Sequence, residues 1–123
     1  MDLPDDEFER LVAEALELIP AEFLAYLENV RIVIEEEPGK ELLKQLHVRR
    51  GNTLFGLYTG TPMTERTHDH VGFPDRITLF RGPLLEECED MDELRVEVAT
   101  TVLHEVAHHF GIGEERLVEL GWG

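Results

Sequence analysis

The segment from His104 to His108 has the residue types and the spacing of a metal site with a neighbouring base. It reads His-Glu-Val-Ala-His, so two imidazoles stand four positions apart and a carboxylate follows the first. On an α-helix, His104 and His108 fall one turn apart and about 40° apart around the axis, so both rings can reach one ion. Glu105 falls about 60° beyond His108, close enough to touch a metal-bound water without being a ligand. The pattern predicts a site for one Zn²⁺ ion that activates water.

A catalytic zinc site needs a third ligand, because zinc usually takes three protein donors and leaves one position for water. Glu114 is the first candidate, because Gly111 permits a sharp turn that can direct a carboxylate three residues later back toward the ion. Glu115 and Glu119 are close by in the sequence and are the alternatives. The simpler interpretation of Glu114 is a first-turn carboxylate that interacts with the dipole of a final helix.

The helix that must carry this motif is marked at both of its ends. Asp90 and Glu93 have the spacing of a capping box, and Gly111 is a typical C-terminal stop. An apolar arc on the opposite side from the histidines should bury the back of the helix against a sheet; its members are Ala99, Val102, Leu103, Val106, Ala107 and Phe110. The two histidines should therefore face outward into a cleft.

Apolar periodicity and turn residues indicate the elements around this helix. An amphipathic helix ends before Pro20, β-branched and aromatic runs indicate short strands, and Gly82 and Pro83 should stop the last of them. The expected elements are helices over 8–19 and 22–27, strands over 30–34, 54–58 and 76–80, a surface loop over 59–75 and a last helix over 114–120. The expected fold is a single α+β domain over residues 1–123, in which a sheet of three or four strands packs on the long helix.

Composition and charge narrow the classes of partner. The chain has 123 residues, 42% hydrophobic and 31% charged, as expected for one compact globular domain. Its formal charge of −16 should repel phosphate backbones and anionic lipids, so neither nucleic acid nor a membrane surface is an expected partner. Cys88 is the only cysteine, which excludes a disulfide framework and a multi-cysteine zinc site. No apolar run reaches the ~18 residues of a membrane span and the N-terminus is acidic, so we expect a cytoplasmic protein.

The motif region resembles the zincin metallopeptidases, and more narrowly the short acidic zincin-like domains of bacteria. The resemblance is carried by His-Glu-Val-Ala-His-His-Phe-Gly over 104–111 and by the segments 56–58, 62–64 and 74–81. It implies a zincin-like fold, zinc bound by His104 and His108, and Glu105 as the general base. Glu114 matches the position where extended zincin motifs place a third ligand, although those motifs usually have His or Asp there. No methionine follows the motif, so the chain is not expected to be a full metzincin.

These expectations define two functional hypotheses. The first is a zinc-dependent peptidase, in which an activated water attacks a peptide bond of a peptide or protein substrate and Glu105 transfers its proton. The second is a metal-binding or protein-interaction module on the same scaffold with little or no hydrolysis, which is favoured by the small size of the domain and the unusual third ligand. Neither the natural substrate nor the oligomeric state follows from the sequence.

Several other residues are candidates for supporting roles. Oxyanion stabilisation needs a donor, and the candidates are Tyr58, His68, His70 and Arg81, each of which could also be an ordinary core or surface residue. Glu97 and Thr101 lie on the same helix face as the motif and could orient the histidines. His109 points about 100° away from His108 and should not be a ligand. Cys88 has acidic neighbours and should be inert.

Overall fold

The computed structural model describes residues 1–48, 53–60 and 75–122, and within them it has six helices and three strands. In chain order they are α1 (Asp5–Leu16), α2 (Ala21–Leu27), β1 (Val30–Glu35), α3 (Lys40–Gln45), β2 (Gly56–Thr59), β3 (Asp75–Phe80), α4 (Arg81–Glu87), α5 (Met91–Phe110) and α6 (Glu114–Glu119). This is the expected α+β architecture, and each predicted helix and strand is present within a few residues of its expected bounds.

The three strands form one mixed sheet in the order β1-β3-β2. β1 pairs with β3 in parallel, starting from Val30 opposite Asp75, whereas β2 pairs with β3 in antiparallel fashion, with Tyr58 opposite Ile77. β3 is the central strand, and four of its six residues are buried. β2 therefore forms one edge of the sheet, and α5 packs directly against it.

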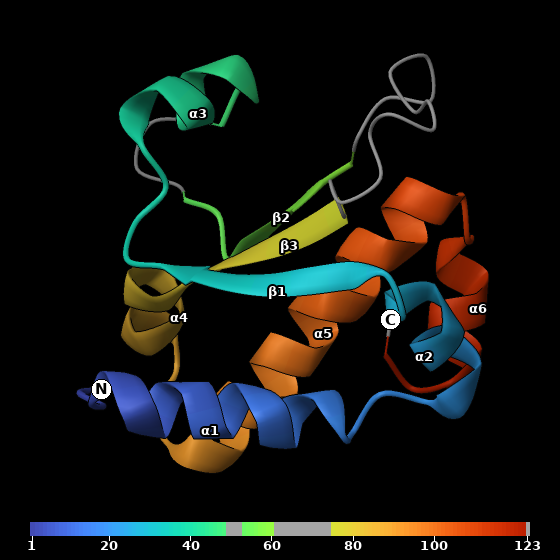
Figure 1. Ribbon diagram of the computed structural model, residues 1–123, viewed down its shortest axis with the longest axis horizontal. Helices are drawn as coiled ribbons and strands as arrows, with labels where there is room; N and C mark the ends of the chain where they lie inside the picture. The colour runs from blue at the N-terminus through green and yellow to red at the C-terminus, as the bar shows by residue number, and fades with distance from the viewer. Residues whose placement is uncertain (49–52, 61–74, 123) are drawn as a thin grey trace.

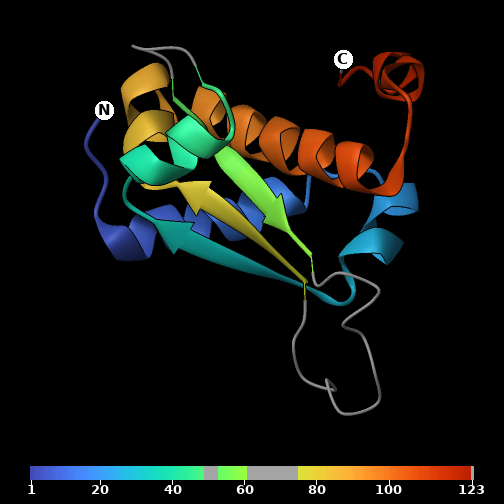
Figure 2. The same cartoon turned by 90° about the horizontal axis from the view of Figure 1, so that it is seen from above.

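Two helices close the core on one side of the sheet. Figure 1 shows α1 and α5 on the same side of the sheet and α3 on the other, and the view in Figure 2 agrees. The α1 side chains that repeat at three- and four-residue spacing are buried, except for the half-buried Leu16, and they meet buried side chains of α5 and β3. Fully buried members of this core include Phe8, Leu11, Ile77, Leu79 and Leu103. Such burial stabilises the fold by roughly 1.5–3 kcal/mol for each large apolar side chain.

α5 begins and ends as its sequence predicts. The Asp90 side chain accepts a hydrogen bond from the backbone N–H of Glu93 at 2.8 Å, and Gly111 follows the helix in the left-handed conformation, with φ of 71°. The predicted apolar arc is buried except for Phe110, whose exposed fraction is 43%. The prediction for Phe110 is wrong because the last turn of α5 extends past the core, where the ring packs against Tyr26 with 4.8 Å between ring centroids.

α3 and α4 were not expected from the sequence. Pro38 and Gly39 precede α3, which buries none of its side chains and so has no strong apolar period. Gly82 and Pro83 do follow the end of β3, but they also lie in the first turn of α4, where proline is tolerated because it removes no helical hydrogen bond. Most of the predicted loop over 59–75 lies outside the described residues. Among the described helices, not one combines the length and apolarity needed to cross a membrane.

Candidate metal centre

Three predicted ligand side chains converge at the C-terminal end of α5. His104 and His108 come from successive turns of α5, and Glu114 is the first residue of α6. The Glu114 Oε1 atom lies 3.5 Å from His104 Nδ1 and 3.6 Å from His108 Nε2. One donor atom from each residue lies within 4.8 Å of the other two. No other group of three potential metal-binding residues forms among the residues that the structure describes.

Two of the three donor-atom separations in this cluster suit a tetrahedral zinc ion. Bonds of about 2.0–2.1 Å at tetrahedral angles place two ligand atoms about 3.4 Å apart, close to the two separations measured here. The rings of His104 and His108 lie 6.3 Å apart at an angle of 75°, so they do not stack on each other. The side chains of His108 and Glu114 are 65% and 60% exposed, so the cluster is open to solvent. A water or substrate molecule could therefore occupy the fourth position.

The turn between α5 and α6 places Glu114. After the left-handed Gly111, the backbone N–H of Ile112 donates to the carbonyl of Ala107 at 2.8 Å and closes the end of α5. Gly113 is then the N-terminal cap of α6, so the chain reverses over three residues and returns Glu114 toward α5. Gly111, which predicted the end of the long helix, thus also brings the carboxylate of Glu114, the third candidate ligand, to the two histidines.

α6 is held in place by one ion pair and one buried side chain. Arg116 donates to both carboxylate oxygens of Glu22 in α2, at 2.6 and 3.0 Å, and these hydrogen bonds raise the pKa of the Arg116 guanidinium. Leu117 is fully buried in the core. Glu119 also accepts from Arg116, at 3.0 Å, and neither it nor Glu115 belongs to the metal cluster. Glu114 is thus the only one of the three candidate carboxylates that the described structure places beside both histidines.

The second ring nitrogen of His104 contacts the backbone that follows α6. His104 Nε2 lies 3.0 Å from the backbone carbonyl oxygen of Trp122. The turn after α6 sets this carbonyl, because the Trp122 N–H donates to the carbonyl of Leu117 at 2.8 Å. Histidines that bind metals commonly donate their other ring N–H to such an acceptor, which fixes the ring orientation and the tautomer. Sequence reasoning missed this contact because a backbone carbonyl leaves no side-chain signature.

Glu105 is bound to the edge of the sheet rather than to the cluster. Its Oε1 atom accepts a hydrogen bond from the backbone N–H of Tyr58 at 2.8 Å. The carbonyl of Phe55 accepts from Phe80 in β3, so by the alternation of an antiparallel ladder the Tyr58 N–H faces the outer edge of β2. The carboxylate thus has one oxygen fixed by the strand, while its second oxygen has no hydrogen-bond partner within the described residues and can face a reacting group.

A glycine sets the close approach of β2 to α5. A Cβ atom on Gly56 would lie 2.7 Å from the Thr101 Cγ2 atom, which is too close for a real side chain, and 3.1 Å from the Thr78 carbonyl oxygen, which is a tight contact. Gly56 therefore lets the strand pack against the motif helix at a distance that brings the Tyr58 N–H to Glu105. Thr101, expected to orient the histidines, instead contacts this strand.

A groove of about 300 Å³ leads away from the centre along α5. It lies between α5 and the segment that enters β2, and its lining residues are Thr53, Leu54, Phe55, Gly56, Glu97, Thr100, Thr101, His104 and Glu105. Burial, and after it the carboxylates of Glu87 and Glu93, raise the pKa of Glu97, while His104 acts in the opposite direction. Glu97 thus lies in this groove rather than in contact with the histidines.

The oxyanion candidates are placed elsewhere or lie outside the described residues. The Tyr58 hydroxyl donates to Asp75 at 2.7 Å, and the His109 ring stacks on Tyr58 with 3.9 Å between centroids. Tyr58 contributes its backbone N–H instead of its hydroxyl, and His109 stays out of the cluster as expected. His68 and His70 lie outside the described residues.

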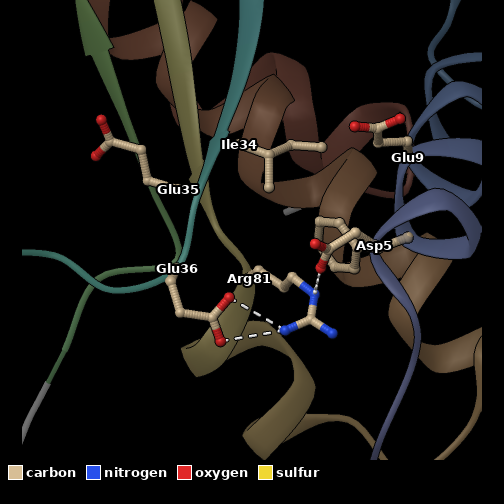
Figure 3. A pocket seen from close by; sticks show the side chains of 7 residues that line it. Asp5, Glu9, Ile34, Glu35, Glu36 and Arg81 are labelled. Carbon is tan, nitrogen blue, oxygen red and sulfur yellow. Dashed lines mark hydrogen bonds and ion pairs between the residues drawn. The ribbon is translucent and has the colours of Figure 1, made fainter.

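Arg81 is far from the metal centre, so its candidacy as an oxyanion donor is wrong. It begins α4, which Figure 1 shows at the opposite end of the molecule from α6. Figure 3 shows its guanidinium between Asp5, at 3.3 Å, and Glu36, at 3.1 Å, and it also donates to the carbonyl of Leu3. These partners link α4 to the N-terminal segment and to the end of β1, so the role of Arg81 is structural.

Cys88 is buried beneath the end of α4. Burial, followed by the nearby carboxylates of Glu93 and Glu97, raises the pKa of its thiol to about 11. The thiol is therefore protonated near neutral pH and has neither the charge nor the access that a nucleophile needs.

Comparisons with known proteins support a zincin-like fold. The family model described as zincin-like metallopeptidase matches residues 27–122. The fold is also similar to a solved structure of a conserved hypothetical protein from Thermus thermophilus, with 25% sequence identity and a TM-score of 0.59. That match covers 88% of this chain and 94% of the other. Among curated proteins, none matches the sequence.

Proposed function

Because the chain belongs to the zincin-like metallopeptidase family, we propose that it is a zinc-dependent peptidase in which Glu105 is the general base. In this proposal His104, His108 and Glu114 hold one Zn²⁺ ion. The observation that carries it is the convergence of their three donor atoms within 4.8 Å at an open surface, beside a carboxylate that is not itself a member of the cluster.

Each residue of the centre has a chemical task in this proposal. When bound, zinc supplies Lewis-acid chemistry that activates water and polarises a peptide carbonyl. Glu105 accepts the proton of the attacking water on the oxygen that Tyr58 does not bind, and then delivers it to the leaving amine. The Tyr58 N–H keeps the carboxylate in place during this transfer. The histidines bind the metal in their neutral form, through the lone pair of one ring nitrogen.

The substrate in this proposal is an extended peptide or protein segment aligned on β2. β2 is an edge strand beside α5, and a peptide can add to such an edge through main-chain hydrogen bonds. By the alternation of the ladder, Gly56 directs its N–H and C=O to the same outer edge as Tyr58, and it lines the groove next to Glu105. The groove is open and shallow, which suits weak general peptidase activity or recognition that depends on a partner.

A metal-binding module without hydrolysis is the second candidate. The hydrogen bond from Tyr58 to Glu105 favours this module, because a carboxylate that already accepts a hydrogen bond is a weaker base. In this alternative the cluster binds metal, Glu105 fastens α5 to the sheet, and no peptide is cleaved.

Zinc-loaded protein, metal-free protein and the Glu105→Gln variant separate the two candidates. The peptidase proposal expects one zinc per chain and cleavage of a broad peptide library that chelation stops. Glu105→Gln should keep the zinc and lose at least ~10²–10⁴-fold in kcat, the usual contribution of a general base. Stoichiometric zinc without cleavage in the unmodified protein would support the module, and equal turnover in the variant would remove Glu105 from the mechanism.

A further inference from the structure

The groove beside Glu105 has chemistry that goes beyond a general peptide cleft. We propose that it binds a basic side chain of the substrate, Lys or Arg, with the Glu97 carboxylate as its ionic partner. This inference rests on the proposed peptidase function and names the class of substrate for that site. Three observations support the inference. They are the position of the groove beside Glu105, its lining by both apolar residues and a carboxylate, and the charges around Glu97.

The groove places Glu97 at a suitable distance from the proposed reaction centre. Glu97 and His104 are seven residues apart on α5, which corresponds to about 10 Å along the helix axis, and both line the same groove. An extended peptide advances about 3.3 Å per residue. A long side chain within one or two positions of the bond next to Glu105 can therefore reach Glu97.

The lining of the groove suits an amphipathic side chain. Leu54 and Phe55 provide apolar surface in the groove, and Thr100 and Thr101 also line it. The Thr100 hydroxyl donates to the Val96 carbonyl of its own helix at 2.7 Å, so it does not compete for the carboxylate. Lysine and arginine pack their aliphatic stems on apolar surface while the charged head remains with a polar partner, which matches this arrangement.

Glu97 is a carboxylate without a cationic partner in the part of the chain that the structure describes. Arg95, the nearest cation along the helix, pairs with Glu14 and Asp92 instead. Among the charged groups that act on Glu97, two are the carboxylates of Glu87 and Glu93, and only His104 opposes them. An incoming ammonium or guanidinium would therefore be the first direct ionic partner of Glu97 among the groups that the structure describes.

The net negative charge of the whole chain also favours a basic substrate. The net charge of −16 attracts basic peptides and repels acidic ones over long range. Glu105 lines the same groove, so an acidic substrate side chain there would meet two carboxylates. Long-range attraction alone would act equally at any site, and the local role of Glu97 therefore needs a separate test.

The test compares two peptides of one sequence that carry either arginine or its uncharged analogue citrulline. Binding is measured on metal-free protein by NMR titration, so that no catalysis is required. We expect the arginine peptide to bind about 5-fold more tightly, a typical effect of one partly exposed ion pair. Glu97→Gln should abolish this preference. Glu86→Gln, which removes one exposed charge from α4, should retain it.

A charge reversal provides the second variant. Glu97→Lys should prefer a glutamate peptide over the arginine peptide, and its thermal unfolding shows whether it is folded. An arginine preference that is unchanged in Glu97→Gln, or equally lost in Glu86→Gln, would overturn the inference. With zinc present, the preference should appear in kcat/KM. Selective binding of arginine without any cleavage would support the groove assignment and refute the peptidase proposal. Cleavage without a preference for arginine would support the peptidase proposal and refute the groove assignment.

Discussion

His104 Nε2 and the Trp122 carbonyl oxygen lie 3.0 Å apart, which joins the first histidine of the motif to the backbone beyond α6. A carbonyl only accepts hydrogen bonds, so the ring nitrogen that faces it must carry the proton. The other nitrogen, Nδ1, then has its lone pair on the side of Glu114, at 3.5 Å from Oε1. The end of the chain thus selects the tautomer of a candidate ligand.

This relationship predicts that neutral His104 is protonated at Nε2 in the metal-free protein. Two-bond ¹H–¹⁵N spectra in weakly alkaline solution should show this tautomer. Trp122→Ala keeps the carbonyl and should keep the tautomer, whereas a chain ended at Gly121 loses the acceptor. Zinc affinity should fall by about 10-fold in that shortened chain, the lower range for loss of such a partner. Protonation at Nδ1 in the unmodified protein would contradict the assignment.

The position of Glu114 predicts a clear difference among three neighbouring carboxylates. Glu114→Gln should weaken zinc binding by about 100-fold, because it removes an anionic ligand next to both histidines. Glu115→Gln and Glu119→Gln change the net charge equally but lie outside the cluster, so each should change the affinity less than ~3-fold. Competition with a fluorescent chelator measures all three dissociation constants. A larger loss of zinc affinity in Glu115→Gln or Glu119→Gln would assign the third ligand to that residue instead of Glu114.

The sequence was most informative where side chains repeat with a helical period or have cap chemistry. The apolar period predicted α1, and the capped α5 and the glycine at 111 predicted the helix and the turn that bring His104 and Glu114 together. α3 was missed because it buries no side chains. α4 was missed because its first turn contains a Gly-Pro pair, which indicates the end of a strand more strongly than the start of a helix.

The supporting contacts of the centre were not predictable, because they involve backbone groups or depend on tertiary packing. The donor to Glu105 is the N–H of Tyr58 and the acceptor for His104 is the carbonyl of Trp122, and every residue type except proline provides both groups. Arg81 was chosen for its charge alone, and only the fold shows that Asp5 and Glu36 already neutralise it.

The tight contact between Gly56 and Thr101 predicts a substitution pair. Gly56→Ala should destabilise the protein by about 1–3 kcal/mol, because the new methyl group overlaps the Thr101 Cγ2 atom and the strand must move. Thr101→Ser removes that atom, so the double variant should recover a substantial part of the loss. Urea unfolding measures the free energies, and additive effects of the two changes would contradict the contact. Gly39→Ala is the control, because no atom lies within 4 Å of its Cβ position.

The buried thiol of Cys88 predicts an alkaline limit to stability. Its pKa rises from an ordinary value of 9.0 to about 11 in the folded chain, mainly through burial. Between these two values the unfolded chain releases the proton and the folded chain retains it, so the free energy of unfolding falls as the pH rises. This contribution should reach about 2 kcal/mol by about pH 11 and be absent below about pH 8. Urea unfolding of the unmodified protein and of Cys88→Ala, compared at about pH 8 and about pH 10.5, isolates it, because all other titrating groups are shared. The difference in stability between the two proteins should narrow at the higher pH. A constant difference would show that the thiol ionises alike in the folded and unfolded chains, which is incompatible with its burial beneath α4.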